Sequence, residues 1–358
     1  MVPSVVAAFS TGRCYRARVV RATGQDGRAF EVEEQLRAIW RRVLHVDDPR
    51  PDDDFFDLGG TSIELVEMIA RVRESIDSGA KLETLCSTPT FAGMVAALAT
   101  GGGEGLDPLV VKVQSGPRPI VSIHSAWGSA LPMNDVARLD RTRGVAAVRA
   151  PGFEDGEPLP ESVEQMAELY LAALDAHDLS PPYTLVGLCA GGVIAFEMAQ
   201  QLGRASVECV GLLATDAPPA SGEIPVVHDD FIRMFHYGRI LALNVVSRGG
   251  DATDVDWDVV ADQAHRMLPV HKAVLTAYYR YTPRFYDGRV VLFQFERPFP
   301  SLAAERIPAY HERQRREWEP YARVEVSTLP GCGSVDNGFE GACAPVLLDA
   351  LAGAVAAA

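Results

Sequence analysis

Apolar residues recur at intervals of three and four in the first third of the chain. The pattern covers residues 32–43, 63–72 and 90–98, and each stretch is typical of an amphipathic helix. A loop rich in Pro and Asp separates the first two stretches, and Ser62 stands where the second helix begins. Pro89 suits the start of the third helix. These residues are therefore predicted to form a small all-α bundle.

The larger, C-terminal part of the chain alternates short apolar runs with helical patterns. Helices are predicted at 163–174 and 193–199, and strands at 119–123, 145–148, 183–186, 210–215 and 324–329. Strands that alternate with helices imply a mostly parallel sheet with right-handed crossovers and helices on both faces.

A glycine-rich segment, residues 100–105, separates the two patterns and cannot itself hold regular structure. We therefore expect an N-terminal extension at 1–29, a small module at 30–98, a linker at 99–108 and a larger module at 109–358.

Composition and charge limit the kind of protein. Hydrophobic residues make up 47% of the chain and charged residues 23%, which is ordinary for a globular protein. The net charge of -15 repels a phosphate backbone, so nucleic acid is not an expected partner. No apolar run approaches the roughly 18 to 20 residues of a membrane span, and the longest one near the N-terminus, Val5 to Phe9, is too short for the apolar region of a signal peptide. The sequence predicts a cytoplasmic protein without a membrane partner.

The acidity is concentrated in the small module. Residues 30–98 hold 14 Asp or Glu and 7 Lys or Arg, a net of -7, which favours docking to basic surfaces of partner domains. The cysteines, in contrast, are scattered without any C-x-x-C spacing, so neither a disulfide nor a zinc site is predicted. They are Cys14, Cys86, Cys189, Cys209, Cys332 and Cys343.

The position of Ser62 alone fits a helix N-cap. The string DFFDLGGTSIELVEM, with TPTFAGMVAAL about 25 residues later, resembles the carrier domain of nonribosomal peptide and polyketide synthases. The resemblance covers residues 30–98. It implies that Ser62 carries 4′-phosphopantetheine as a covalent cofactor, and the LGG form favours a peptidyl carrier. A phosphodiester at a helix N-terminus is stabilised by free amides.

The segment Gly187 to Gly191 matches G-x-S-x-G with Cys189 in place of serine. In such a nucleophile elbow the chain turns sharply from strand to helix and projects the central side chain over the edge of the sheet. A phosphate-cradling loop is the alternative, but the spacing fits neither the dinucleotide motif nor the P-loop. In this class the acid follows the nucleophile along the chain, and Asp216 lies at the end of the next predicted strand.

From about Leu109 onward the chain resembles the type I thioesterase domain that ends nonribosomal peptide synthetases, an α/β-hydrolase fold with a helical lid. The matching segments are IVSIHSAWGS, PPYTLVGLCAGGVIAFEMAQQL and GLLATDAPP. The resemblance implies that Cys189 is the nucleophile, Asp216 the acid, and the backbone amides of Ala190 and Ala126 the oxyanion hole. The lid is expected at about 221–280.

The sequence departs from the family at the catalytic base. Family members place a histidine just after the last strand, and Gly333 occupies that position here. Three explanations stay open: the histidine was removed by design or lost naturally, a lid histidine such as His265 or His271 replaces it, or the chemistry needs little base because a thiol already ionises by a few per cent at neutral pH. No metal is expected.

The sequence thus predicts the terminal carrier and thioesterase of a nonribosomal peptide or hybrid polyketide synthetase. An acyl or peptidyl chain would pass from Ser62 to Cys189 and leave by cyclisation, aminolysis or hydrolysis. Expected partners are the upstream condensation and adenylation domains and a phosphopantetheinyl transferase. The alternative is a disabled thioesterase-like domain that only docks or shelters the carrier-bound chain, and Gly333 is the reason to consider it.

Overall fold

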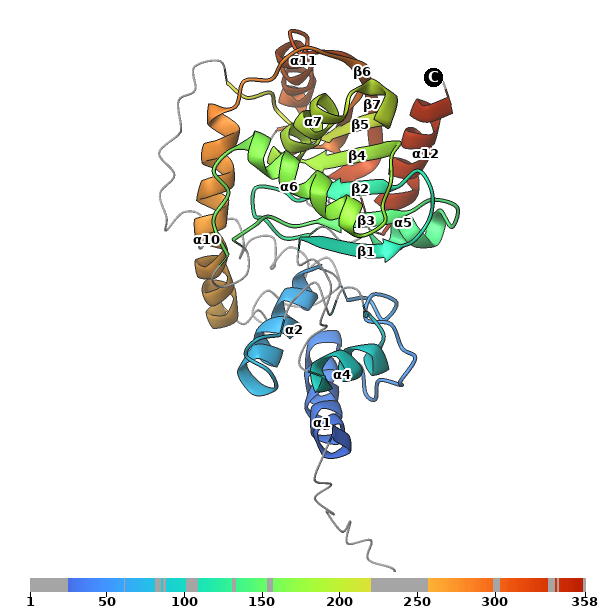
Figure 1. The fold of residues 1–358 in the computed structure, drawn as a ribbon, viewed down its shortest axis with the longest axis vertical. Helices are drawn as coiled ribbons and strands as arrows, with labels where there is room; N and C mark the ends of the chain where they lie inside the picture. The colour runs from blue at the N-terminus through green and yellow to red at the C-terminus, as the bar shows by residue number, and fades with distance from the viewer. Residues whose placement is uncertain are drawn as a thin grey trace, which may run out of the picture.

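The computed structural model describes residues 25–60, 62–80, 85, 88–100, 109–130, 133–152, 157–219, 257–298, 303–333, 339 and 341–356. A small helical module lies below a larger module built on a sheet (Figure 1). Within the described residues, no helix is both long enough and apolar enough to cross a membrane, and no cluster of His, Cys, Asp and Glu could hold a metal ion.

The small module packs three helices around an aromatic centre. They are α1 (Gln25–Leu44), α2 (Ser62–Ser75) and α4 (Phe91–Ala99). The indole of Trp40 meets the rings of Phe55 and Phe91 edge-on, at centroid distances of 5.4 and 5.2 Å. Thr90 caps α4 by accepting a hydrogen bond from the N–H of Gly93. The predicted bundle is confirmed, although α1 begins at Gln25, inside the predicted N-terminal extension.

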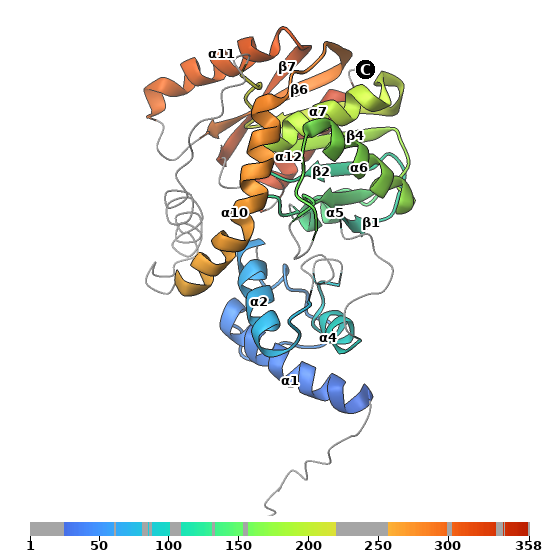
Figure 2. The ribbon, with the colours of Figure 1, turned by 60° about the vertical axis from the view of Figure 1, so that its left-hand side comes forward.

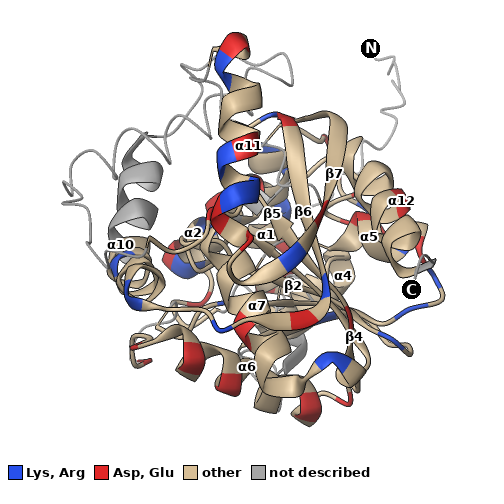
Figure 3. Cartoon of the chain, turned by 90° about the horizontal axis from the view of Figure 1, so that it is seen from above, with Lys and Arg blue, Asp and Glu red and all other residues tan. Residues whose placement is uncertain are grey.

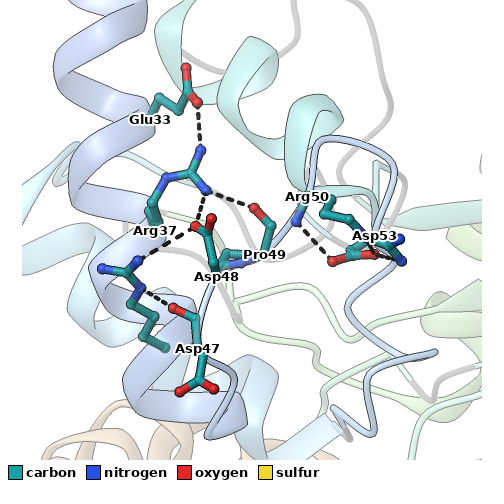
Figure 4. Close-up of polar contacts among 8 residues, drawn as sticks. Glu33, Arg37, Asp47, Asp48, Pro49, Arg50 and Asp53 are labelled. Atoms are coloured by element: carbon teal, nitrogen blue, oxygen red, sulfur yellow. Dashed lines mark hydrogen bonds and ion pairs between the residues drawn. The ribbon is translucent and has the colours of Figure 1, made fainter.

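Ion pairs fasten the loop after α1 onto that helix (Figure 4). The guanidinium of Arg37 contacts the carboxylates of Glu33 at 2.6 Å and Asp48 at 2.7 Å. Further along, Arg50 pairs with Asp53 at 2.8 Å. These contacts fix the path of the chain toward the turn that precedes α2.

The larger module contains a seven-stranded sheet in the order β1-β3-β2-β4-β5-β6-β7. Strand β1 pairs antiparallel with β3, and the other neighbours are parallel. The predicted doubly covered, mostly parallel sheet is confirmed. The strands are β1 (Val110–Gln114), β2 (Ile120–Ile123), β3 (Val145–Val148), β4 (Tyr183–Leu188), β5 (Val207–Leu213), β6 (Tyr286–Arg297) and β7 (Ala322–Gly333).

Helices cover both faces of the sheet because side chains alternate between the two faces along each strand. Residues of α6 (Val163–Ala176), α7 (Ala190–Leu202) and α10 (Trp257–Arg280) share one buried core with one set of strand residues. The other strand residues pack with α5 (Asn134–Leu139) and α12 (Cys343–Ala356). Helix α11 (Ile307–Trp318) joins β6 to β7 and carries several arginines (Figure 3).

The last strand differs from the prediction. Strand β7 continues beyond the predicted end at Leu329 and includes Gly333. It is the edge strand of the sheet, where a proline such as Pro330 removes no ladder hydrogen bond that the sheet needs. The pairing with β6 shifts between Phe295 and Arg297, so a bulge takes up the extra residues.

A disulfide joins Cys332, at the end of β7, to Cys343, at the start of α12. The cysteine spacing predicts no disulfide, and the structure corrects this. Two cysteines 11 residues apart on different elements leave no recognisable motif in the sequence. Along the sequence, Gly333 therefore lies between the two bonded cysteines.

Candidate functional site

Cys189 stands alone between β4 and α7, at the turn that the motif predicts. Its backbone has a φ of 55° and a ψ of -123°, a strained conformation for a residue with a side chain. Its N–H donates to the carbonyl of Leu213 on the neighbouring strand at 2.9 Å. Cys189 is an exposed residue, whereas Cys209 is buried. The strained turn therefore presents Cys189 above the sheet.

The flanking glycines leave no room for side chains. A Cβ atom at Gly187 would lie 2.1 Å from the carbonyl oxygen of Gly191. At Gly191 a Cβ would lie 2.1 Å from the carbonyl oxygen of His124. The elbow is thus wedged against the loop that follows β2, and this close packing requires both glycines.

Two backbone amides contact the sulfur of Cys189. Although Cys189 is exposed as a residue, the protein atoms packed around its sulfur desolvate the thiol and raise its pKa, and the backbone N–H groups of Ala190 and Ala126, which hydrogen-bond to the sulfur, lower it again. The nearby carboxylate of Asp216 raises it further, and the pKa stays above its ordinary value. The two amides named from the sequence therefore converge on the same sulfur, although they lie on different elements.

Asp216 lies three residues beyond the end of β5 rather than at its tip, because β5 ends at Leu213. Its backbone carbonyl accepts a hydrogen bond from the Tyr278 hydroxyl at 3.1 Å. Its carboxylate forms an ion pair with Arg313 of α11 at 3.4 Å. Burial and the Asp216 carboxylate both raise the pKa of Tyr310, a second side chain of α11. The carboxylate thus pairs with α11 and lies near enough to Cys189 for its charge to raise the pKa of that thiol.

No imidazole occupies the position of the expected base, because Gly333 ends β7 there. Among the side chains that the structure describes, the hydrogen bonds to the Asp216 carboxylate come from α11 and none comes from a histidine. The described contacts therefore do not include the acid–histidine pair of a complete triad.

Of the two lid histidines named from the sequence, the structure describes the side chain of only one. The side chain of His265 lies outside the described residues. The Nδ1 atom of His271, on α10, lies 3.2 Å from the carbonyl oxygen of Ala126, and its ring stacks on Trp127 at a centroid distance of 4.1 Å. Because a carbonyl only accepts, Nδ1 must donate. His271 is therefore bonded to the loop whose amide reaches Cys189.

His124, which begins the same loop, was not selected from the sequence although it lies in the IVSIHSAWGS segment. Its ring is fully buried between the Tyr170 hydroxyl at 2.6 Å and the carbonyl of Ser125 at 2.7 Å. Burial lowers the pKa of His124 to about 4, so the ring is neutral at ordinary pH. With both nitrogens bonded, His124 supports the loop from beneath.

Ser62 is the first residue of α2. The turn before it requires glycine twice, since Gly59 has a φ of 92° and a Cβ at Gly60 would lie 2.2 Å from the ring of Phe55. A serine at a helix N-terminus supplies a hydroxyl for a phosphodiester and backbone N–H groups that stabilise its charge. The residues at this position therefore fit a phosphopantetheine group.

Comparisons with known proteins agree with this division. A family model described as a phosphopantetheine attachment site matches residues 34–98, and one described as a thioesterase domain matches residues 118–227. The chain is a carrier domain followed by a thioesterase domain. The cofactor of the carrier domain is covalently attached 4′-phosphopantetheine.

Relatives of this carrier–thioesterase include three large synthetases. They are atromentin synthetase invA1 of Paxillus involutus (33% identical over 48% of the chain), malpibaldin synthetase of Mortierella alpina (28% over 87%) and the dimodular nonribosomal peptide synthase of Bacillus subtilis strain 168 (31% over 55%). The chain spans only 19%, 6% and 8% of their lengths.

One solved structure extends the likeness across both domains. The four-domain nonribosomal peptide synthetase holo-AB3403, bound to AMP and glycine, matches 90% of this chain with a TM-score of 0.54 at 20% identity, and 26% of that chain is covered. This agreement shows the fold. Together the matches divide the chain into a segment similar to phosphopantetheine attachment domains and a segment similar to thioesterase domains.

The exact domain and lid boundaries stay predictions. The family models leave out the predicted extension at 1–29 and the C-terminal part of the thioesterase domain. Of the predicted lid at 221–280, residues 221–256 lie outside the described residues, and the remainder forms α10.

Proposed function

We propose that Cys189 is the nucleophile of this thioesterase and that Ser62 is the phosphopantetheine attachment residue of its carrier. The observation that carries the proposal is the convergence of two backbone amides on the sulfur of an exposed, strained elbow residue. Phosphopantetheine supplies a terminal thiol, to which the chain is joined as a thioester.

The first half-reaction is a thioester exchange. The thiol of Cys189 loses its proton to solvent, and the sulfur attacks the carbonyl carbon of the arriving thioester. The N–H groups of Ala126 and Ala190 interact with this sulfur, so we expect them to stabilise the charge that develops on the oxygen of a carbonyl bonded to it. The intermediate then expels the donor thiolate, which takes up a proton from solvent, and the acyl group remains on Cys189.

The second half-reaction releases the acyl group. An amine attacks the thioester carbonyl, the sulfur of Cys189 leaves as a thiolate, and the excess proton of the new amide passes to solvent. A thioester reacts readily with amines, whereas water is a poor nucleophile without a general base. Because Gly333 stands where the base is expected, release by aminolysis or cyclisation is favoured over hydrolysis.

Asp216 remains the acidic residue proposed for this site. Its carboxylate forms an ion pair with Arg313 of α11, and its negative charge raises the pKa of the Cys189 thiol. The proposed partners are the upstream condensation and adenylation domains, which would supply the acyl chain, and a phosphopantetheinyl transferase acting on Ser62. A cytoplasmic location stays a prediction.

The test is acylation by a small soluble thioester, followed by intact mass spectrometry. A medium-chain acyl N-acetylcysteamine thioester should add one acyl mass to the protein. The adduct should be absent in Cys189→Ala and present in Cys209→Ala, the matched control, because Cys209 is a buried free cysteine. An adduct that persists in Cys189→Ala, or no adduct on the parent protein, would overturn the proposal.

A further inference from the structure

An arginine of the thioesterase domain reaches across to the carrier domain. Arg138, on α5, places Nη2 2.5 Å from the carboxylate of Asp57 and 3.4 Å from that of Asp54. Both aspartates belong to the acidic turn, defined here as residues 54–60. The contact therefore joins opposite charges on two different domains.

The guanidinium is held in place from its own side. Its Nη1 atom pairs with Asp135, one turn earlier on α5, at 3.1 Å. The other oxygen of Asp135 accepts a hydrogen bond from the N–H of Gly341 at 2.7 Å. Because Asp135 is itself fixed by the chain before α12, Arg138 is pre-oriented toward the carrier, which lowers the entropy lost on pairing.

The acidic turn is equally well ordered. The carboxylate of Asp54 accepts hydrogen bonds from the N–H groups of Phe56 at 2.8 Å and Asp57 at 3.3 Å. A backbone bridge also joins Asp54 to Thr90, the cap of α4. The turn runs through its two glycines toward Ser62, the first residue of α2. A protein that binds this turn thus fixes the position where α2 begins.

A second contact between the two domains involves α2, the helix that begins at Ser62. Helix α2 contacts α10 of the thioesterase domain, and the two helices lie close together in both views, with one end of α2 beside α10 (Figures 1 and 2). The same α10 carries His271, which bonds to the carbonyl of Ala126. The carrier is therefore held at two places, by the Arg138 pair and by a helix that also contacts the candidate oxyanion loop.

We propose that Arg138 is the docking residue with which the thioesterase domain recognises the acidic turn of its own carrier in the orientation that delivers the acyl chain. This proposal rests on the proposed function of Ser62 and Cys189. The Arg138 side chain is 32% exposed and that of Asp57 61% exposed, so the pair is partly screened by solvent and weak. A weak contact suits a carrier that must also leave to visit upstream domains.

Charge reversal tests the docking role in the full chain with an acyl-loaded carrier. Arg138→Glu should slow transfer of the acyl group to Cys189 about five- to tenfold and leave acylation by the small thioester unchanged. The double variant Arg138→Glu with Asp57→Arg should recover most of the lost rate. The matched control is Arg141→Glu, since Arg141 is exposed on the loop after α5 and forms no ion pair found among the described residues.

Hydrogen exchange gives a readout that does not depend on Cys189. Amides of the acidic turn should exchange faster in Arg138→Glu than in Arg141→Glu, and the double variant should restore their protection. Equal exchange and equal transfer in the Arg138→Glu and Arg141→Glu variants would overturn the docking proposal. If the small thioester acylates no variant, the proposed function fails instead, and the exchange measurement still decides the docking contact.

Discussion

His271 donates a hydrogen bond from Nδ1 to the carbonyl oxygen of Ala126 across 3.2 Å, while the N–H of Ala126 contacts the sulfur of Cys189. We therefore expect His271 to position the loop after β2, which carries the Ala126 amide, rather than to act as a base. His271→Phe keeps a ring to stack on Trp127 but loses the donor, and should slow acylation by a small thioester roughly fivefold, the effect of about 1 kcal/mol.

The conservative variant separates positioning from general structural damage. The amide nitrogen of His271→Asn can replace Nδ1, so this variant should retain most of the acylation rate. The loss in His271→Phe should appear in kcat rather than KM, because the affected amide acts in the transition state. If the Phe and Asn variants acylate equally fast, His271 does not position the loop.

Asp216 should affect the ionisation of the Cys189 thiol through its negative charge. Besides burial, its negative charge raises the pKa of the Cys189 thiol, so Asp216→Asn should lower that pKa. The pH profile of Cys189 alkylation by iodoacetamide, followed by mass spectrometry of the peptide, should shift to lower pH in this variant. An unshifted profile, or one that moves to higher pH, would contradict the described arrangement.

His124 should make the stability of the thioesterase domain depend on pH. Burial lowers its pKa from 6.5 to about 4 in the folded state, so the unfolded chain binds the proton more tightly. The stabilising effect is present above about pH 6.5 and is lost as the pH falls toward 4. From pH 7 to pH 5 this one group should reduce the free energy of unfolding by about 2 kcal/mol.

Urea unfolding of the parent protein and of His124→Gln at the two pH values checks this effect. The Gln variant should be less stable at pH 7 and should lose less stability between pH 7 and pH 5. Tyr170→Phe, which removes the hydroxyl 2.6 Å from Nε2, should cost about 1 kcal/mol at pH 7. An identical pH dependence in the Gln variant and the parent would refute the assignment.

Restoring a histidine at position 333 should change which product forms. Gly333→His returns the residue type that the family places after the last strand, and a general base contributes about 100- to 10,000-fold. We expect the release of free acid from acylated Cys189 to increase at least tenfold. Gly333→Ala is the control for adding a side chain at the end of β7. Equal hydrolysis in the His and Ala variants would show that the glycine does not limit release.

Features that depend on neighbouring residues in the sequence, such as the buried strands and the turn at Cys189, could be predicted. Strands β2 and β3 are continuous apolar runs, as expected for strands that are buried on both faces. The elbow was predictable because the clashes that exclude a Cβ at Gly187 and Gly191 come from within the motif and its immediate neighbours. Strand β6 was not predicted, although residues 290–293 form a continuous apolar run within it.

Contacts between distant parts of the chain could not be predicted in this way. His271 and Ala126 are 145 residues apart, and neither the lone histidine nor the alanine shows that the two will meet. The same holds for Arg138 and Asp57, which lie on different domains. The charge imbalance of the carrier indicated a docking surface but not its partner residue, because only folding brings α5 next to the turn.

The most direct test of the central claim follows one acyl group through a single turnover. The carrier is loaded at Ser62 with a labelled acyl group, the reaction is quenched at intervals, and peptide mass mapping locates the label. The account predicts that the label leaves the Ser62 peptide and appears on the Cys189 peptide, and that it stays on Ser62 in Cys189→Ala. Loss of the label from Ser62 at the same rate in parent and Cys189→Ala, with none on the Cys189 peptide, would contradict it.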